Sequence, residues 1–298
     1  MRIALTGASG LIGSALRSAL TADGHMVLPL VRHEPGPGEG AWNPETGELR
    51  GEFDGLDAVV HLAGENIASG RWTRARKERI RRSRVEGTRG LARSLAALAA
   101  PPRALVCASA IGWYGDRGEE VLTEESPPGR GFLAGVCRDW EAAAEPAREA
   151  GLRVVHLRIG VVLAREGGAL ARMLPPFRLG LGGRIGNGRQ WWSWITREEL
   201  VSVIRHALED QGLEGPVNAV ALESVRNAEF TRVLARVLRR PAVLPVPAFA
   251  LRLALGEMAG ELLLASTRVD PARLRDRGYR WREPGLEEAL RRILQRRV

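Results

Sequence analysis

Short apolar runs alternate with helix-like stretches along the first half of the chain. Runs typical of buried strands cover residues 3–5, 25–32, 57–64, 104–110 and 153–163. Apolar residues with helical spacing occupy 11–22 and about 133–150, and a basic helix is expected from 71 to about 100. Apolar strands that alternate with helices form parallel sheets with both faces covered. The pattern therefore predicts an α/β fold with a doubly wound parallel sheet.

The pattern changes after residue 164. A loop-rich stretch with several tryptophans leads to a predicted helix at 197–210 and a late strand at 215–221, and the last third is mostly helical. We expect residues 1–165 and about 200–222 to form a nucleotide-binding domain. Residues of about 166–199 and 223–298 are expected to form a small, mostly helical C-terminal lobe that holds a substrate.

Composition places limits on the kind of protein. The chain has 298 residues, 45% of them hydrophobic, which is ordinary for a folded domain of this size. It has neither an uncharged apolar run of about 18 residues nor an export signal, so we expect a cytoplasmic protein and no membrane partner. Cys107 and Cys137 are too few for a disulfide framework, and no metal site is expected.

The formal charge of +9 comes almost entirely from arginine, since Lys77 is the only lysine. The densest basic run covers residues 71–84, and we interpret it as the solvated face of a helix because Ile80 provides a buried position. No nucleic-acid recognition module is visible, so nucleic acid is not an expected partner. A homodimer is left open.

A glycine-rich turn follows the first predicted strand. In the stretch "TGASGLIG", Gly7 permits a tight turn, Gly10 lets the backbone approach a pyrophosphate, and Gly13 lets the next helix pack close to the sheet. The phosphates would then lie over the helix N-terminus, where free N–H groups and the helix dipole favour negative charge. The motif predicts a dinucleotide site.

The end of the second strand bears on cofactor choice. An acidic residue there would accept the ribose hydroxyls of NAD, but this chain has Arg32. An arginine can pair with the 2′-phosphate of NADP and stack on adenine. We therefore predict NADP(H) as the cofactor.

Several ordered motifs resemble the short-chain dehydrogenase/reductase superfamily in its extended, NAD-dependent epimerase/dehydratase-like branch. They are "TGASGLIG", "HLAGENI" from His61, "SAIGWYGD" from Ser109, "LRIGVVL" from Leu157 and "GNGRQWWSWITREEL" from Gly186. Within that branch the chain is similar to sugar-nucleotide-epimerase-like proteins of undefined activity. The resemblance implies a Rossmann fold with NADP(H) in the N-terminal domain and a substrate in the C-terminal lobe.

The resemblance also implies cofactor-binding positions. Those that match the phosphate loop are Gly7, Ser9, Gly10, Leu11, Ile12 and Gly13, and Arg32 matches the 2′-phosphate position. Those that match the strand end beside the ribose are Leu62, Ala63 and Gly64, with Glu65 and Arg84 as neighbours. Ile159 and Gly160 match the segment beside the nicotinamide.

The catalytic pattern of the superfamily is incomplete. A Tyr-x-x-x-Lys pair should fall near residue 135, where a lysine one helical turn after the tyrosine lowers its pKa. The candidate positions hold instead Phe132, Leu133, Val136 and Cys137. The remaining catalytic candidates are Ser109 and Tyr114, and without a lysine the Tyr114 hydroxyl is expected to keep a pKa near about 10.

The loop after residue 183 carries candidate substrate contacts. Arginine beside flat aromatic rings can hold a phosphate and stack a ring. The candidates are Arg184, Asn187, Arg189, Gln190 and Trp191. Two functions stay open at this point. One is an NADP-dependent epimerase or reductase that acts on a small or nucleotide-linked substrate with a non-standard acid–base set. The other is a catalytically silent NADP(H)-binding protein that regulates a partner or senses redox state.

Overall fold

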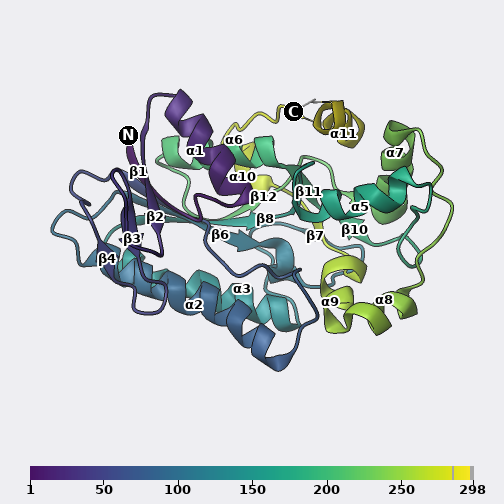
Figure 1. Cartoon of the computed structure of the whole chain (residues 1–298), viewed down its shortest axis with the longest axis horizontal. Helices are drawn as coiled ribbons and strands as arrows, with labels where there is room; N and C mark the ends of the chain where they lie inside the picture. Colours follow the sequence, from purple (N-terminus) through teal and green to yellow (C-terminus); the bar gives the residue numbers. More distant parts are fainter. Residues whose placement is uncertain (284, 296–298) are drawn as a thin grey trace.

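A computed structural model describes residues 1–283 and 285–295, and within them eight strands form one large sheet (Figure 1). The strands are β1 (Arg2–Thr6), β2 (Met26–Val31), β3 (Gly40–Trp42), β4 (Leu49–Arg50), β5 (Ala58–His61), β6 (Ala104–Ala110), β8 (Arg153–Ile159) and β12 (Gly215–Ala219). They lie in the order β12-β8-β6-β5-β1-β2-β3-β4, and every neighbouring pair is parallel except β3–β4. The strand order reverses beside β1, which is where ligands bind in doubly wound sheets.

Helices cover both faces of this sheet. On one face lie α1 (Leu11–Ala22) and α6 (Arg197–Glu209), and on the other lie α2 (Arg74–Ala96), α3 (Phe132–Ala142) and α4 (Glu145–Glu149) (Figure 1). Strands buried on both faces need apolar side chains at most positions, which explains their nearly continuous apolar runs. The predicted doubly wound α/β fold is confirmed.

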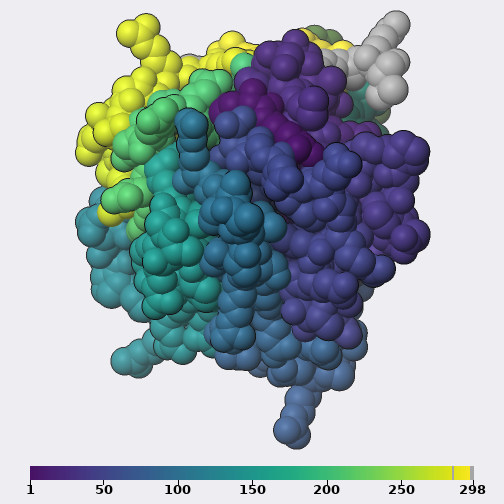
Figure 2. Space-filling view, turned by 90° about the vertical axis from the view of Figure 1, so that its left-hand side faces the viewer, coloured from purple at the N-terminus to yellow at the C-terminus, as the bar shows by residue number. Residues whose placement is uncertain are grey.

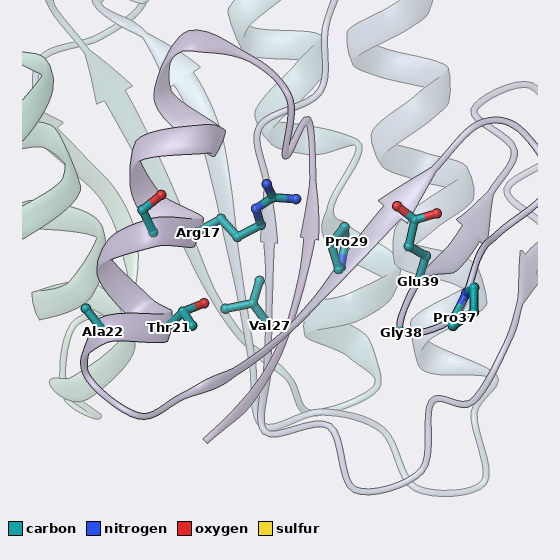
Figure 3. A pocket seen from close by; sticks show the side chains of 9 residues that line it. Arg17, Thr21, Ala22, Val27, Pro29, Pro37, Gly38 and Glu39 are labelled. Atoms are coloured by element: carbon teal, nitrogen blue, oxygen red, sulfur yellow. The ribbon is translucent and has the colours of Figure 1, made fainter. Parts of the chain in front are cut away.

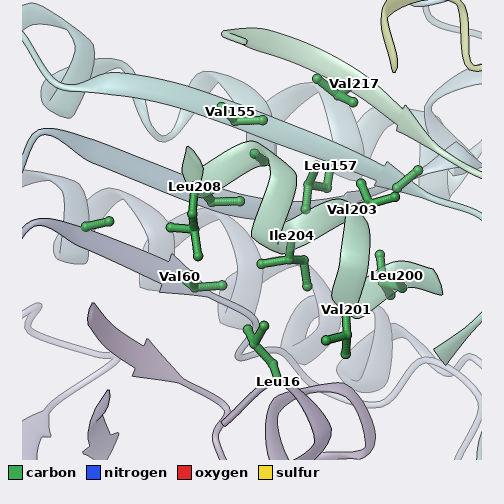
Figure 4. Packing of buried hydrophobic residues seen from close by; sticks show 14 of the residues in the cluster. Leu16, Val60, Val155, Leu157, Leu200, Val201, Val203, Ile204, Leu208 and Val217 are labelled. Atoms are coloured by element: carbon green, nitrogen blue, oxygen red, sulfur yellow. The ribbon is translucent and has the colours of Figure 1, made fainter. Parts of the chain in front are cut away.

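The core under α1 and α6 shows how the helices are held to the sheet. Leu16 from α1, Val60 from β5 and Ile204 from α6 are at most 1% exposed and belong to one apolar cluster (Figure 4). Burial of each such side chain contributes about 1.5–3 kcal/mol. The cluster lies directly beneath the glycine turn and fixes where α1 starts relative to the strands.

Two predicted elements are divided in the structure. The helix expected at about 133–150 is broken between α3 and α4, and Pro146 lies in the first turn of the second helix. The strand expected at 153–163 is divided into β8 and β9 (Val161–Leu163) at Gly160. A Cβ at Gly160 would lie 2.8 Å from the Ser193 carbonyl oxygen, so the chain can pass there only without a side chain.

A second, mostly helical group of elements lies beyond the ends of the strands, and several of its members share a core of their own (Figure 1). Its elements are α5 (Gly168–Arg178), β10 (Trp191–Trp192), β11 (Trp194–Thr196), β13 (Val225–Arg226), α7 (Asn227–Leu238), α8 (Ala248–Leu255), α9 (Glu257–Ala259), the π-helical turn η2 (Gly260–Leu264) and α11 (Leu286–Gln295). β10 pairs with β13, and β11 pairs with β9. Trp192, Trp194 and Phe230 fill the centre of this core.

The C-terminal segment crosses back to the large sheet. β14 (Arg268–Val269) pairs with β7 (Val121–Leu122), and α10 (Ala272–Asp276) packs on β12. Leu274 is buried in the same cluster as α1 and α6, with Tyr279 and Trp281 packed against it. In Figure 2 the yellow C-terminal residues lie beside the green residues of α6. Residues 274–281, which the sequence places in the substrate lobe, therefore contact the nucleotide-binding sheet.

Within the part of the chain that the structure describes, no helix is both long and apolar enough to cross a membrane.

Candidate functional site

The glycine turn after β1 is as tight as its sequence requires. Gly7 has a φ of +69°, a backbone conformation that other residues rarely adopt. A Cβ at Gly13 would lie 2.1 Å from the Gly7 carbonyl oxygen, and one at Gly10 would lie 3.2 Å from the same atom. A Cβ at Gly7 would lie 3.0 Å from the backbone carbonyl carbon of Leu62. The three glycines thus hold α1 against β1 and the end of β5.

The start of α1 offers unpaired backbone donors. Gly10 caps the helix and has no side chain that could accept from its first N–H groups. Ser9 and Gly10 are exposed, and Leu11 and Ile12 are half-buried, so this terminus is accessible. Free N–H groups and the helix dipole suit a phosphate. The predicted phosphate-loop residues therefore fit the pyrophosphate of a dinucleotide.

A buried polar chain fixes the end of β5 beside this turn. The Thr6 hydroxyl oxygen accepts hydrogen bonds from the Leu62 and Ala63 N–H groups at 3.1 and 3.2 Å. It also bonds His61 at 2.7 Å, and the other ring nitrogen of His61 bonds Thr88 at 3.1 Å. Burial lowers the pKa of His61 to about 4, so its ring is neutral at pH 7. No role was predicted for these three polar residues; for Thr6 and His61 the available signal is a polar residue at the end of an apolar run.

Arg84 reaches the loop after β5 from the middle of α2. Its Nη1 donates to the carbonyl oxygens of Glu65 at 3.0 Å and Ile80 at 3.3 Å. A Cβ on Gly64 would lie 3.5 Å from the Arg84 Cζ. The Glu65 carboxylate pairs with Arg76 at 3.3 Å. The structure thus brings Gly64, Glu65 and Arg84 together at the carboxyl end of β5.

The other predicted cofactor residues lie along the same edge of the sheet. Arg32 follows β2 directly and is exposed. Among the described residues, no carboxylate lies within ion-pair distance of Arg32, so its guanidinium is available to an anion. Ile159 ends β8, and the Gly160 N–H donates to the Ala219 carbonyl oxygen at 3.1 Å. These positions follow the carboxyl ends of parallel strands, where a dinucleotide would lie.

Ser109 belongs to a buried ionic network. Its hydroxyl donates to Glu141 Oε1 at 2.7 Å, and Glu141 accepts two hydrogen bonds of 2.9 Å from Arg158. The side chains of Arg158 and Glu141 are only 3% and 10% exposed. Arg158 also donates to the Tyr114 hydroxyl at 3.0 Å and lies 3.9 Å from the Trp113 ring centre. The network therefore ties Ser109 on β6 to the turn η1 (Ile111–Tyr114).

Tyr114 points into the protein interior. Its side chain is fully buried beside Leu122, and its hydroxyl donates to Asn218 Oδ1 at 2.6 Å. Burial raises the pKa of Tyr114 to about 12, although Arg158 acts in the opposite direction. The expected pKa of about 10 is wrong, because it took account of the missing lysine but not of desolvation, which raises the pKa of a buried phenol.

Two of the residues at the expected tyrosine and lysine positions, Leu133 and Cys137, pack against the η1 turn. A Cβ on Gly112 in η1 would contact Leu133 at 3.2 Å and the Cys137 Sγ at 3.7 Å. Leu133 and Cys137 are one helical turn apart on α3, and both face the turn that follows Ser109. Burial raises the pKa of Cys137 to about 12. Leu133 has no acidic proton, and a thiol with so high a pKa is only a weak acid at neutral pH.

A cavity of about 310 Å³ lies beside the second core. The predicted substrate residues Asn187, Arg189 and Gln190 line it, together with Asp116 and Arg252. Asn187 and Arg189 are exposed, whereas Gln190 is buried and its amide donates to the carbonyl oxygens of residues 185 and 263. Arg184 is outside this lining, and its carbonyl oxygen accepts from the Val246 N–H.

Trp191 lies at the margin of this cavity in a charged cluster. Its indole N–H donates to Glu119 at 2.9 Å. The guanidiniums of Arg226 and Arg268 lie 4.6 and 4.5 Å from the Trp191 ring centre. Arg226 also binds Glu119 at 2.9 Å. The hydrogen bond from the Trp191 indole and the one from Arg226 together hold the pKa of the Glu119 carboxyl below its usual value. Two arginines therefore already contact the ring that the sequence offered for stacking.

A larger hollow of about 680 Å³ lies along β2, between α1 and the loop before β3 (Figure 3). The chain passes from β2 to β3 without a crossover helix, which leaves this part of the sheet face uncovered. Arg17, Pro29 and Glu39 are among the lining residues. None of the predicted site residues lines this hollow. Within the described residues, no group of His, Cys, Asp or Glu side chains could hold a metal ion.

A doubly wound sheet with a glycine turn at its switch point defines a Rossmann-type nucleotide-binding protein. Residues 3–220 match the model of the NAD dependent epimerase/dehydratase family, and residues 246–293 match the model described as "Domain of unknown function (DUF1731)". The chain belongs to the NAD dependent epimerase/dehydratase family, which confirms the resemblance stated from its motifs.

Similar proteins occur in distant organisms. Epimerase family protein ML0860 of Mycobacterium leprae is 44% identical over 290 residues, which cover 97% of this chain and 94% of the relative. Epimerase family protein SDR39U1 of Homo sapiens is 38% identical over 298 residues, which cover 99% of this chain and 100% of the relative. The crystal structure of human SDR39U1 (isoform 2) with NADPH has a TM-score of 0.92 at 36% identity and covers 99% of both chains.

Proteins of lower identity share the fold alone. The Thermus thermophilus UDP-glucose 4-epimerase complex with NAD has a TM-score of 0.76 at 21% identity, covering 99% of this chain and 98% of the epimerase.

Proposed function

We propose that this protein binds NADP(H) at the carboxyl edge of its sheet and holds it without the usual proton donor of the superfamily. The observation that carries this proposal is the engagement of both remaining hydroxyls. Ser109 is bonded to Glu141, and Tyr114 is fully buried between Arg158 and Asn218. An acid–base group has to reach the reacting oxygen directly or through one water. Cofactor binding is therefore the function that this site supports best, in a regulatory or redox-sensing role.

The binding residues have distinct tasks. The glycine turn and the start of α1 would bind the pyrophosphate, and Arg32 would pair with the 2′-phosphate of the adenosine ribose. Leu62 and Ala63, held by Thr6, would support the ribose beyond the pyrophosphate. When bound, the nicotinamide supplies hydride chemistry, and the chain's own residues orient it and exclude water.

The second candidate is an epimerase or reductase that acts on a small or nucleotide-linked substrate. The cavity of about 310 Å³ supports it, because Arg189 and Arg252 can meet an anionic group while Asp116 can accept from hydroxyls. Its proton would have to come from solvent or from the substrate. Without a positioned general acid, turnover is expected to be about 10²–10⁴-fold slower than in a complete site.

Calorimetry with NADPH and NADH tests the proposed function. NADPH is expected to bind at least about tenfold more tightly, because Arg32 makes a charge-assisted contact only with the 2′-phosphate. Arg32→Asp should remove this preference, while the same change at Arg103, which is also exposed and lies before β6, should leave it unaffected. Equal affinity of the native protein for both cofactors would refute the assignment of Arg32.

Turnover distinguishes the two candidates. NADPH oxidation is followed with aldehydes, ketones and nucleotide sugars, at protein concentrations high enough to detect single turnovers. The binding role predicts tight NADPH binding without substrate-dependent oxidation. Oxidation that disappears in Arg189→Ala, with NADPH binding retained, would instead establish the enzyme.

A cytoplasmic location stays a prediction, with Cys107 and Cys137 both free and buried, and a homodimer stays open.

A further inference from the structure

Arg84 differs from its neighbours on α2 in how its charge is compensated. Arg76 pairs with Glu65, Arg81 pairs with Asp139 at 2.8 Å, and Arg82 pairs with Glu45 and Glu86 at 3.4 and 3.2 Å. Arg84 instead donates from Nη1 to two backbone carbonyls. Among the described residues, no carboxylate lies within ion-pair distance of it. A half-buried cation is thus held in place by neutral acceptors, through one of its nitrogens.

The position of this guanidinium is fixed from three sides. It lies 5.1 Å from the ring centre of Trp140 on α3, and a Cβ on Gly64 would touch its Cζ and both Nη atoms at 3.5–3.6 Å. Burial lowers the pKa of Arg84 from its usual value, while Cys137 and Glu65 are close enough to its charge to act in the opposite direction. These contacts leave Arg84 little freedom, so a ligand that meets it need not restrict a mobile side chain.

This location coincides with the next part of the dinucleotide path. The glycine turn contacts the Leu62 and Ala63 backbone, and Arg84 contacts the two residues that follow. A cofactor whose pyrophosphate lies on α1 extends past the carboxyl end of β5 towards β6. On that side the α3 positions that face η1 hold Leu133 and Cys137, which carry no charge at neutral pH. Arg84 is therefore the cation available beside the second ribose.

We infer that Arg84 binds the ribose on the nicotinamide side of NADP(H) and makes the site prefer the reduced cofactor to the oxidised one. The inference rests on the proposed function, since it needs the dinucleotide to bind at the glycine turn. Nε and Nη2 donate to the ribose hydroxyls, while Nη1 keeps its two carbonyl bonds. The nicotinamide ring is neutral in NADPH and positively charged in NADP⁺. A nearby cation that forms no direct ion pair repels only the oxidised ring, because like charges at short range in a partly desolvated site interact strongly.

The experiment measures dissociation constants of three probes by calorimetry. NADPH and NADP⁺ carry the nicotinamide ribose, whereas adenosine 2′,5′-bisphosphate carries only the adenine half. The variants are Arg84→Gln and Arg84→Lys, and the matched control is Arg82→Gln, which removes the same charge from the exposed side of α2. Urea unfolding of each variant confirms that it is folded.

The expected result separates the two halves of the cofactor. Arg84→Gln should weaken NADPH binding about tenfold to hundredfold, the worth of a hydrogen bond from a charged donor. Its affinity for adenosine 2′,5′-bisphosphate should stay within about twofold of the native value, and its ratio of NADPH to NADP⁺ affinity should fall towards one. Arg84→Lys should keep that ratio, because it keeps the charge, and Arg82→Gln should behave like the native protein.

Other outcomes refute specific steps. Native NADPH affinity and native redox preference in a folded Arg84→Gln protein would overturn the role of Arg84. Equal losses of affinity for NADPH and for the bisphosphate would mean that Arg84 acts only by holding the loop after β5. This result would also overturn its proposed role at the nicotinamide ribose. If the native protein binds no bisphosphate, the proposed NADP(H) site itself fails, independently of Arg84. If Arg84→Gln does not fold, the test rests on Arg84→Lys. Loss of the preference for NADPH over NADP⁺ in that variant would contradict the charge effect.

Discussion

Replacement of Arg158 by methionine tests the buried ion pair that holds Ser109 and the η1 turn. Methionine keeps most of the side-chain volume but removes the charge and all donors. Glu141 would lose two hydrogen bonds of 2.9 Å and keep only the one from Ser109. The Tyr114 hydroxyl and the Glu124 carbonyl oxygen would each lose a donor at 3.0 Å. The carboxylate of Glu141 would then remain nearly buried without a counter-charge.

The expected loss follows from that burial. Removal of one partner from a buried ion pair typically costs about 3–5 kcal/mol of unfolding free energy. Because the Glu141 side chain is only 10% exposed, solvent can screen little of the charge that is left behind, so the effect should lie within this range. Arg158→Met combined with Glu141→Leu removes both charges. The double variant should therefore be more stable than Arg158→Met alone.

Urea unfolding at pH 7, followed by circular dichroism and tryptophan fluorescence, measures both effects. The control is Arg138→Met on α3. The Arg138 side chain is 63% exposed, so this change should alter stability by no more than about 0.5 kcal/mol. Two results would refute the reasoning. One is a loss below about 1 kcal/mol in Arg158→Met at an unchanged denaturant slope. The other is a double variant whose loss equals the sum of the single losses, which would mean that the two charges are not coupled.

Two further predictions concern the glycine turn and the pH dependence of stability. Gly13→Ala should abolish NADPH binding, because its Cβ would lie 2.1 Å from the Gly7 carbonyl oxygen, whereas Gly135→Ala on α3 has open space and should bind normally; calorimetry compares them. Burial lowers the pKa of His156 to about 4, so between pH 6.5 and 4 only the unfolded chain takes up its proton, and stability falls as the pH decreases. His156→Leu should therefore reduce the loss of unfolding free energy between pH 7 and 5 by about 2 kcal/mol, as measured by urea titration at both pH values. An unchanged pH dependence in this variant would contradict the lowered pKa.

Local pattern alone determined the sheet and the glycine turn. Continuous apolar runs, helical spacing and the placement of Gly7, Gly10 and Gly13 directly after a strand depend on residues that are close in sequence. These features are governed by backbone geometry and by burial on both sheet faces, which a single sequence records directly. The α/β fold and the family resemblance could therefore be predicted.

The direction of individual side chains depended on the tertiary structure. Ser109 and Tyr114 are near neighbours in sequence, and both were expected at the catalytic edge. The η1 turn instead directs Tyr114 into the core, where Asn218 on β12 accepts a hydrogen bond from its hydroxyl and burial raises its pKa. The partner residue is 104 positions away along the chain, so no local pattern could reveal it.

Charge compensation was also decided by the fold. The sequence contains many arginines of identical chemistry, and it does not show which of them is paired. The packing of α2 against α3 gives Arg81 a carboxylate, while Arg84 bonds the carbonyl oxygen of Glu65 in the loop after β5 and that of Ile80 on its own helix. The pairing of Arg158 with Glu141 likewise requires β8 and α3 to meet. A charge acquires its pKa, its partner and its task from groups that are brought near it in space, and these contacts exist only after the chain has folded.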